Sequence, residues 1–294
     1  MEAPTDEERQ TLWETFHEII YELLQYRDLL FQLTLRDIRI RYKQAVMGVG
    51  WAIFMPMLIV AAGFVVRYAI AHMAKSELNW GDFAAMGIKA LPWAFFVGAI
   101  GFATTSLTSN INLVTKIYFP RAVLPLSAVL AQAFDTAIGA AAIAALLFFL
   151  EIRFSLQTLW AIPLLVLLFL FTVGMAFFVS CANLFFRDVK YIVQVLLTFG
   201  IFFTPVFYEP SNFGPWGCHL MMLNPLAPLL EGSRLAIVEH HNLFHSIVLT
   251  SSGGLPIIAW HPAYLVYAAC WAVVGCLGAW LLFHKLQFLY AEYI

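Results

Sequence analysis

The chain has 294 residues, of which 62% are hydrophobic and 12% are charged. An ordinary soluble domain is about 45–50% apolar and about 25% charged, so this composition excludes that class and indicates a membrane protein. The formal net charge of −2 gives no support for binding to nucleic acid or to an acidic partner. The four cysteines form no CxxC pair, so no disulfide framework is expected.

The N-terminal segment is predicted to form an amphipathic helix. Between Thr11 and Leu33, apolar side chains recur every three or four residues, and acidic or polar side chains occupy the other faces. The segment carries too much charge to cross a bilayer, so we expect it to lie along the membrane interface or on a partner. Its acidic residues also argue against a cleavable signal peptide and favour a cytoplasmic N-terminus.

A basic elbow leads into the first apolar run and contains Arg36, Arg39, Arg41 and Lys43. On a helix, three of these cations share one face and form a positive surface at the depth of the lipid headgroups. One interpretation is that they anchor the chain to anionic lipid. The other is that they receive a lipid-linked pyrophosphate, for which arginine supplies forked donors.

Six apolar segments are long enough, or nearly so, to cross a hydrocarbon core that requires roughly 20 helical residues. We expect residues 1–45 to form a cytoplasmic segment and residues 46–294 to form the transmembrane domain. Most of the 16 Lys and Arg residues then lie on the cytoplasmic side, as the positive-inside rule requires, and both termini are cytoplasmic. The predicted spans are 51–72, 90–113, 123–150, 160–186, 191–208 and 263–283.

Residues 209–262 do not fit a simple up-and-down bundle. This segment is rich in Pro, Gly, His and Trp, and its apolar pieces are too short to cross a membrane. We therefore expect short re-entrant or interfacial helices on the outer side. Within it, Glu231 and Arg234 are three residues apart and are predicted to pair on one helix face.

Two connections and two charges inside the spans complete the set of features. The loop NLVTKIYFPRAVLP, residues 112–125, contains aromatic side chains that have little reason to face water, so we expect it to dock into a partner or to lie at the membrane interface.

The turn around Arg187, Asp188 and Lys190 is expected to hold a local ion pair. Arg67 and Asp135 lie near the middle of spans, so they should face the protein interior or a wet cavity; for Arg67 the alternative is an anchor whose side chain reaches the outer interface.

Enzyme signatures are absent from the sequence. There is no HExxH, no GxSxG and no Walker loop, because no lysine follows a glycine. We therefore expect no catalytic residue, metal site or bound cofactor in this chain.

Four motifs in order resemble the permease subunit of ABC exporters that move bacterial polysaccharides, notably O-antigen and teichoic-acid exporters. They read LRDIRIRYKQAVMGVGWAIFMP, NLVTKIYFPRAVLPLSAVL, FFRDVKYIVQVLLTFGIFFTPVFY and NPLAPLLEGSRLAI, and they extend from about Thr34 to Ile237. The resemblance implies an all-α membrane protein of the bacterial inner membrane that forms a homodimer and docks two copies of a cytoplasmic ATPase. ATP and Mg belong to that partner. The coupling element is expected at Lys116, Ile117, Tyr118, Phe119, Pro120 and Arg121.

The resemblance also gives the aromatic content of 16% a purpose. In such exporters spans one, two and five line a channel between the two copies, and short helices after span five gate it on the outer side. Sugar rings stack their C–H faces on aromatic rings, and conduction requires weak, repeated sites of this kind. The candidate channel residues are Trp51, Phe54, Phe64, Tyr68, Trp93, Phe95, Phe96, Phe199, Phe202, Phe203 and Phe207.

The expected function is export of an undecaprenyl-pyrophosphate-linked polysaccharide. Two alternatives stay open: a membrane-embedded transferase of glycan assembly, and a permease of the same fold that moves drugs or other lipids.

Overall fold

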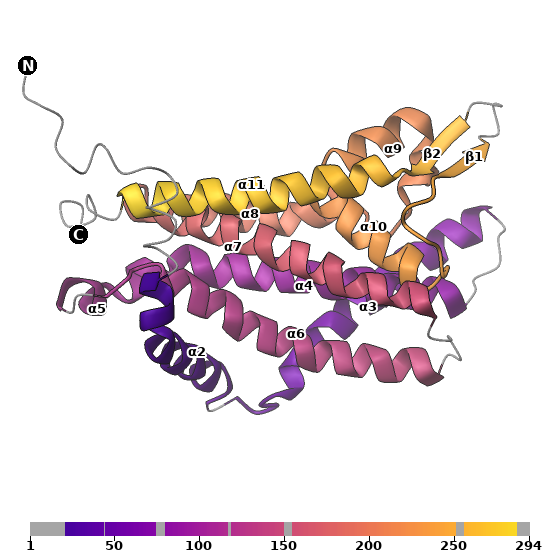
Figure 1. Ribbon diagram of the computed structural model, residues 1–294. Helices are drawn as coiled ribbons and strands as arrows, with labels where there is room; N and C mark the ends of the chain where they lie inside the picture. The colour runs from indigo at the N-terminus through magenta and orange to yellow at the C-terminus, as the bar shows by residue number, and fades with distance from the viewer. Residues whose placement is uncertain are drawn as a thin grey trace, which may run out of the picture.

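The computed structural model describes residues 21–43, 45–74, 80–116, 119–149, 155–250 and 256–286. They form an elongated bundle of helices that run along its length, with a small hairpin at one end (Figure 1). The elements in chain order are α2 (Arg27–Tyr42), α3 (Gly50–Ala74), α4 (Trp80–Ser109), α5 (Ile111–Lys116), α6 (Val123–Phe149), η2 (Leu156–Trp160), α7 (Ala161–Phe185), α8 (Val189–Phe203), η3 (Pro210–Phe213), α9 (Gly214–Met222), α10 (Leu226–Ile237), β1 (Ile247–Thr250), β2 (Pro256–Trp260) and α11 (Pro262–Leu286).

Among the described residues, five helical segments are long and apolar enough to cross a membrane: Gly50–Ala69, Gly81–Ser109, Val123–Phe149, Leu156–Phe185 and Pro262–Leu286. The predicted fifth span, 191–208, is the apolar helix α8, which has only 15 residues. A helix of this length rises about 22 Å, less than the roughly 30 Å of a hydrocarbon core. It ends because Thr204, in extended conformation, precedes Pro205, and a residue before proline disfavours the helical region.

The helix α4 is the centre of the bundle. It packs against α3, α6, α7, α8 and α10, and Ala99 and Ala103 on it are fully buried. It begins ten residues before the predicted second span, which brings Asp82 and Lys89 into the helix. Small side chains let neighbouring helices approach closely, which replaces the hydrophobic driving force that lipid does not supply.

The helices α7 and α11 also approach closely, at Gly174. A Cβ atom at this position would lie 2.7 Å from Cα and 2.9 Å from the main-chain nitrogen of Cys276. Backbone atoms cannot move aside as a flexible side chain can, so only glycine fits here.

The basic elbow is part of a helix. Of the predicted amphipathic helix, residues 11–20 lie outside the described residues, and α2 continues through the elbow to Tyr42. It packs against α6 at one end of the bundle (Figure 1), and its buried residue is Leu33.

The segment after α8 contains the expected short helices together with an unexpected hairpin. The helix α10 is buried along nearly its whole length and packs against α4, α7 and α11. The strands β1 and β2 pair antiparallel and lie beside α9 at the end of the bundle opposite α5 (Figure 1). The all-α expectation is therefore corrected by this two-stranded sheet.

We predict that Gly174→Ala lowers the free energy of unfolding by about 1–3 kcal/mol, because the new methyl group must push α11 away. The measurement is thermal unfolding of the purified chain in detergent. Gly275→Ala is the matched control on α11: its added Cβ meets no atom within 4 Å, so stability should stay within about 0.5 kcal/mol of the wild type. Equal stability of the two variants would contradict the close approach of α7 and α11.

Candidate functional site

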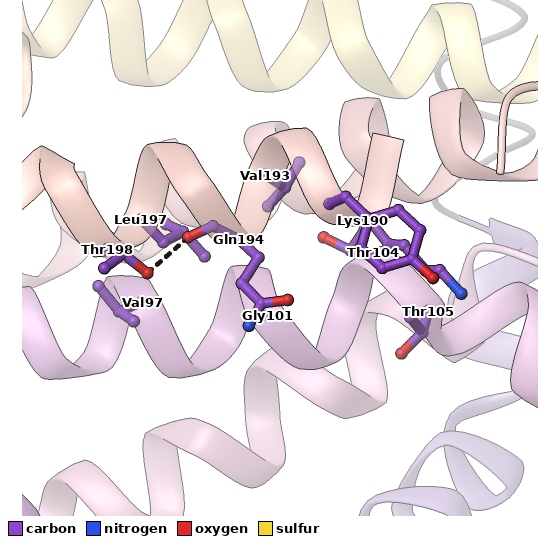
Figure 2. A pocket seen from close by; sticks show the side chains of 10 residues that line it. Val97, Gly101, Thr104, Thr105, Lys190, Val193, Gln194, Leu197 and Thr198 are labelled. Carbon is purple, nitrogen blue, oxygen red and sulfur yellow. Dashed lines mark hydrogen bonds between the residues drawn. The ribbon is translucent and has the colours of Figure 1, made fainter. Parts of the chain in front are cut away.

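A groove of about 460 Å³ runs between α4 and α8 (Figure 2). Its α4 wall is one helix face, because Val97, Gly101, Thr104 and Thr105 recur at intervals of three or four residues. Its α8 wall contains Val193 and Leu197 together with Lys190, Tyr191, Gln194 and Thr198. The groove therefore lies between two helices that are otherwise strongly apolar.

A polar stripe lies along this groove. Lys190, Gln194 and Thr198 follow each other at i, i+4 and i+8 on α8. Lys190 lies beside Thr104 and Thr105 of α4, and Thr198 lies beside Val97 (Figure 2). Thr198 donates to the main-chain oxygen of Gln194 at 2.8 Å, and Thr104 donates to that of Ile100 at 2.6 Å. Polar groups at membrane depth normally face a protein interior or a water-filled cavity.

The amide of Gln194 is the group on this stripe that is available to a cargo. Its side chain points toward Gly101 (Figure 2), where the opposite wall has no side chain. Within the part of the chain that the structure describes, the amide makes no hydrogen bond. An amide both donates and accepts, which suits the hydroxyl groups of a sugar.

Six of the predicted channel aromatics are exposed on helix surfaces, and none of the six lines the groove. Trp51, Phe54 and Tyr68 are exposed on α3, and Phe199, Phe202 and Phe203 are exposed on α8. Phe64 is half-buried and stacks on Phe83 with ring centroids 4.3 Å apart.

The other four predicted channel aromatics are buried in the chain. Trp93, Phe95, Phe96 and Phe207 are 4–9% exposed. The first three are buried because α4 is surrounded by other helices, and the ring of Phe207, which follows α8, lies against Gly63 of α3. Phe95 and Phe96 stack on Phe169 and Phe171 of α7. We correct their assignment from channel lining to packing.

The basic elbow divides into paired and unpaired cations. Arg41 bonds to Asp135 at 2.6 Å and to Gln132 at 2.8 Å, and its guanidinium lies 3.8 Å from the centre of the Phe102 ring. Arg36 pairs with Asp37 at 2.8 Å. Arg39 and Lys43 are exposed and have no ionic partner among the described residues.

The Arg41 pair fixes the elbow on α6. Tyr42 adds a hydrogen bond of 2.5 Å to Asp135, and Asp37 accepts a bond of 3.0 Å from Ser127. Burial of Tyr42, followed by the hydrogen bond to this carboxylate, raises the pKa of its hydroxyl above the ordinary value. Arg41 therefore positions α2, which leaves Arg39 and Lys43 as the elbow cations that can meet a phosphate.

The predicted coupling element lies at the same end of the bundle as α2, next to α5 (Figure 1). Ile117, Tyr118 and the side chain of Lys116 lie outside the described residues. Phe119 is 7% exposed and Pro120 is buried, because this part of the loop folds back onto the bundle core. Phe119 is thus a packing residue and not an exposed docking side chain, while Arg121 is half-buried.

An ionic network lies near the other end of the bundle, and the sequence reasoning identified only part of it. Glu231 and Arg234 pair at 2.5 Å, as their spacing predicts. Lys89 is 2% exposed; its Nζ lies 3.5 Å from Glu231 Oε2 and donates to the main-chain oxygen of Tyr208 at 2.7 Å. Glu239 bonds to Arg234 at 2.5 Å.

A second branch of this network joins α3 to the outer segment. Arg67 bonds to Asp82 at 2.6 Å and lies 3.7 Å from Glu209, which is 3.9 Å from Arg234. The expected interior position of Arg67 agrees with this pairing. Lys89 was missed because the hydropathy pattern placed it just outside the second span, although a lysine followed by an uninterrupted apolar run was a usable signal.

The turn after α7 differs from the expectation. Arg187, Asp188 and Lys190 form no ion pair among the residues that the structure describes. Instead the Lys190 ammonium lies 4.7 Å from the centre of the Tyr191 ring. A cation over an aromatic face is stabilised without a carboxylate, which leaves Lys190 at the end of the groove nearest α5.

These features define a polytopic membrane protein with a groove between the span α4 and the shorter apolar helix α8, which carries polar side chains. Residues 28–238 match the family model described as ABC-2 type transporter. The chain belongs to the ABC-2 type transporter family.

Two relatives narrow the comparison. The chain is 29% identical over 228 residues to the O-antigen export system permease protein RfbA of Myxococcus xanthus, an alignment that covers 76% of this chain and 85% of the relative. It is 30% identical over 211 residues to a protein of the same name from Klebsiella pneumoniae, covering 71% of this chain and 80% of the relative.

We predict that Lys89→Met lowers the free energy of unfolding by roughly 3–5 kcal/mol, because it leaves Glu231 as a buried carboxylate with one cation fewer. Thermal unfolding in detergent measures the effect. Lys285→Met removes an exposed lysine of α11 and should change stability by less than about 0.5 kcal/mol. A Lys89→Met protein as stable as this control would show that the network does not hold α10 in place.

Proposed function

We propose that this chain is the permease of an ATP-driven exporter that moves a polysaccharide linked to undecaprenyl pyrophosphate from the cytoplasm across the bacterial inner membrane. Two copies form the conduit, and each copy docks one separate ATPase subunit that binds ATP and Mg. The groove between α4 and α8 is the single observation that carries the proposal, because polar side chains along an apolar span suit a hydrated cargo. Both relatives are named as O-antigen export permeases, which supports O-antigen as the type of polymer.

The groove suits a sugar chain better than a compact apolar drug. Its polar groups are hydroxyls, an amide and one ammonium group, and exposed aromatic rings lie along α3 and α8 on either side of α4. This combination offers hydrogen bonds and stacking surfaces that each hold a sugar weakly. Weak binding at many positions lets a polymer advance.

The exposed elbow cations give the lipid head a place to bind first. The helix α2, which contains Arg39, lies at the same end of the bundle as α5 (Figure 1). The Arg41 guanidinium lies over the ring of Phe102, which follows the groove residue Gly101 in α4. A pyrophosphate held at this elbow would leave the attached glycan beside the groove mouth. The element from Lys116 to Arg121 then lies where an ATPase in the cytoplasm would act on the helices.

A glycan-assembly transferase is the weaker alternative. Such an enzyme needs an unengaged acid pair or a metal site at the membrane face. Asp135 is bound by Arg41 and Tyr42, and Glu231 is bound by Lys89 and Arg234. These acids therefore serve in structural ion pairs.

The groove can be tested by filling it. We predict that Gln194→Phe abolishes export, because the ring occupies the space opposite Gly101 and removes the amide. The readout is surface polysaccharide on cells in which the wild-type gene is replaced by the variant, with co-purification of the ATPase as a check on assembly. Val195→Phe is the control, since Val195 is exposed and does not line the groove. Wild-type export by Gln194→Phe, or loss of some other lipid or drug efflux instead of polysaccharide, would overturn the proposal.

The elbow can be tested without breaking the fold. We predict that the double variant Arg39→Glu/Lys43→Glu reduces export roughly tenfold or more, since each cation near an anionic surface contributes about 1 kcal/mol. The chain should unfold at the wild-type temperature, because neither side chain is paired. Arg27→Glu/Arg187→Glu makes the same change in charge at exposed positions elsewhere and should export normally. Equal export by the two double variants would reduce the elbow to a general anchor.

A further inference from the structure

A second, smaller cleft lies at the end of the bundle opposite α5, between α9, β2 and the start of α11 (Figure 1). Its volume is about 240 Å³, and it shares no residue with the groove between α4 and α8. None of the described residues that line it is acidic, and none is a lysine or an arginine. The lining residues are Pro215, Trp216, His219, Pro256, Ile258 and Tyr264.

The walls of the cleft are held in place by buried neighbours. Cys218 is buried, and its thiol donates to the main-chain oxygen of Ile258 at 3.3 Å, which ties α9 to β2. Trp260 is fully buried and donates from Nε1 to the main-chain oxygen of Leu243 at 3.0 Å. In β2, Ile257 is buried, and Pro256 and Ile258 on either side of it face the cleft. A register shift at Ala259 interrupts the alternation, and Trp260 beyond it is buried as well. A ligand would meet a preformed surface.

Trp216 is the unusual residue of this cleft, because its side chain is 87% exposed. It lies one helical turn from His219, whose Nδ1 is 3.3 Å from the hydroxyl of Tyr264. An open indole face thus adjoins an imidazole and a phenol, which can donate and accept hydrogen bonds. This arrangement combines a flat apolar surface with polar groups at its edge.

We propose that this cleft binds one neutral pyranose ring of a saccharide. The C–H groups on one face of the ring pack against the negative face of the Trp216 indole, while ring hydroxyls bond to His219 and Tyr264. The described lining contains no Asp, Glu, Lys or Arg, which favours a neutral sugar over a uronic acid or an amino sugar. The volume, below the roughly 300–1,000 Å³ of a site for a drug-sized ligand, suits a single ring.

The proposal rests on the proposed function, because an exported polymer brings such rings to this end of the molecule. A sugar held here after leaving the groove would hinder backward movement of the chain. Weak binding is sufficient for that role, since each new repeat unit presents another ring.

The test is saturation-transfer NMR on the full chain in lipid nanodiscs, with methyl α-mannopyranoside, methyl β-galactopyranoside and methyl α-rhamnopyranoside as probes. Sorbitol is the negative probe, because it has the hydroxyl groups but no ring face. We expect transfer to the C–H protons of one face of at least one pyranoside and none to sorbitol. Trp216→Ala should weaken binding about fivefold, whereas Trp216→Phe keeps an aromatic face and should retain most of it.

Trp271→Ala is the matched control, since Trp271 is also an exposed tryptophan but lies in α11 away from the cleft. Its binding should equal that of the wild type. Three results would each overturn the proposal: no transfer to any pyranoside, equal transfer to sorbitol, or an equal loss in Trp216→Ala and Trp271→Ala. If Trp216→Ala changes the depth of the chain in the bilayer but leaves pyranoside binding unchanged, Trp216 is an interfacial anchor and the saccharide site is rejected.

The binding assay needs neither the ATPase nor export, so its failure is distinguishable from failure of the proposed function. If cells export polysaccharide but the purified chain binds no pyranoside, only the saccharide site is rejected. If the chain binds a pyranoside but its deletion leaves surface polysaccharide unchanged, only the export function is rejected.

Discussion

The ammonium group of Lys89 sets the main constraint on this structure. A charged lysine that is 2% exposed inside an apolar bundle destabilises the fold unless it is paired. Here its partners are Glu231 of α10 and the main-chain oxygen of Tyr208. The short helix α10 is therefore tied to α4, although it is too short to cross the membrane on its own. The strand β2 packs against α9, and α9 contacts α10, so the hairpin is linked to α10 through α9.

A comparable pair organises the opposite end of the molecule. Arg41 and Asp135 join α2 to α6 and fix the direction in which the elbow presents its remaining cations. The two ends thus use the same physical device, a desolvated ion pair between a span and a shorter helix. One pair joins α2 to α6, and the other joins α10 to α4.

Local pattern identified most of the fold, because apolar length alone determines which segments can cross a membrane. The long spans, the basic elbow and the pair between Glu231 and Arg234 all followed from spacing and composition. The burial of individual side chains could not be predicted in this way. Trp93 and Trp51 are equally aromatic in the sequence, but only the packing of neighbouring helices around α4 determines that the first is buried and the second exposed. The polar side chains of Lys190, Gln194 and Thr198 are four residues apart, so their common helix face could be predicted from the sequence. Only aromatic side chains were predicted to line a channel, and these three were not among them.

The shortness of α8 has a consequence for the surrounding lipid. A helix that rises about 22 Å leaves several ångströms of hydrocarbon without a matching protein surface, and a bilayer meets such a mismatch by thinning at modest cost. The exposed side chains on this helix include Tyr191, Ile192 and Val195, and the same helix forms one wall of the groove. A thinner bilayer beside α8 lowers the electrostatic cost of placing polar groups next to this helix.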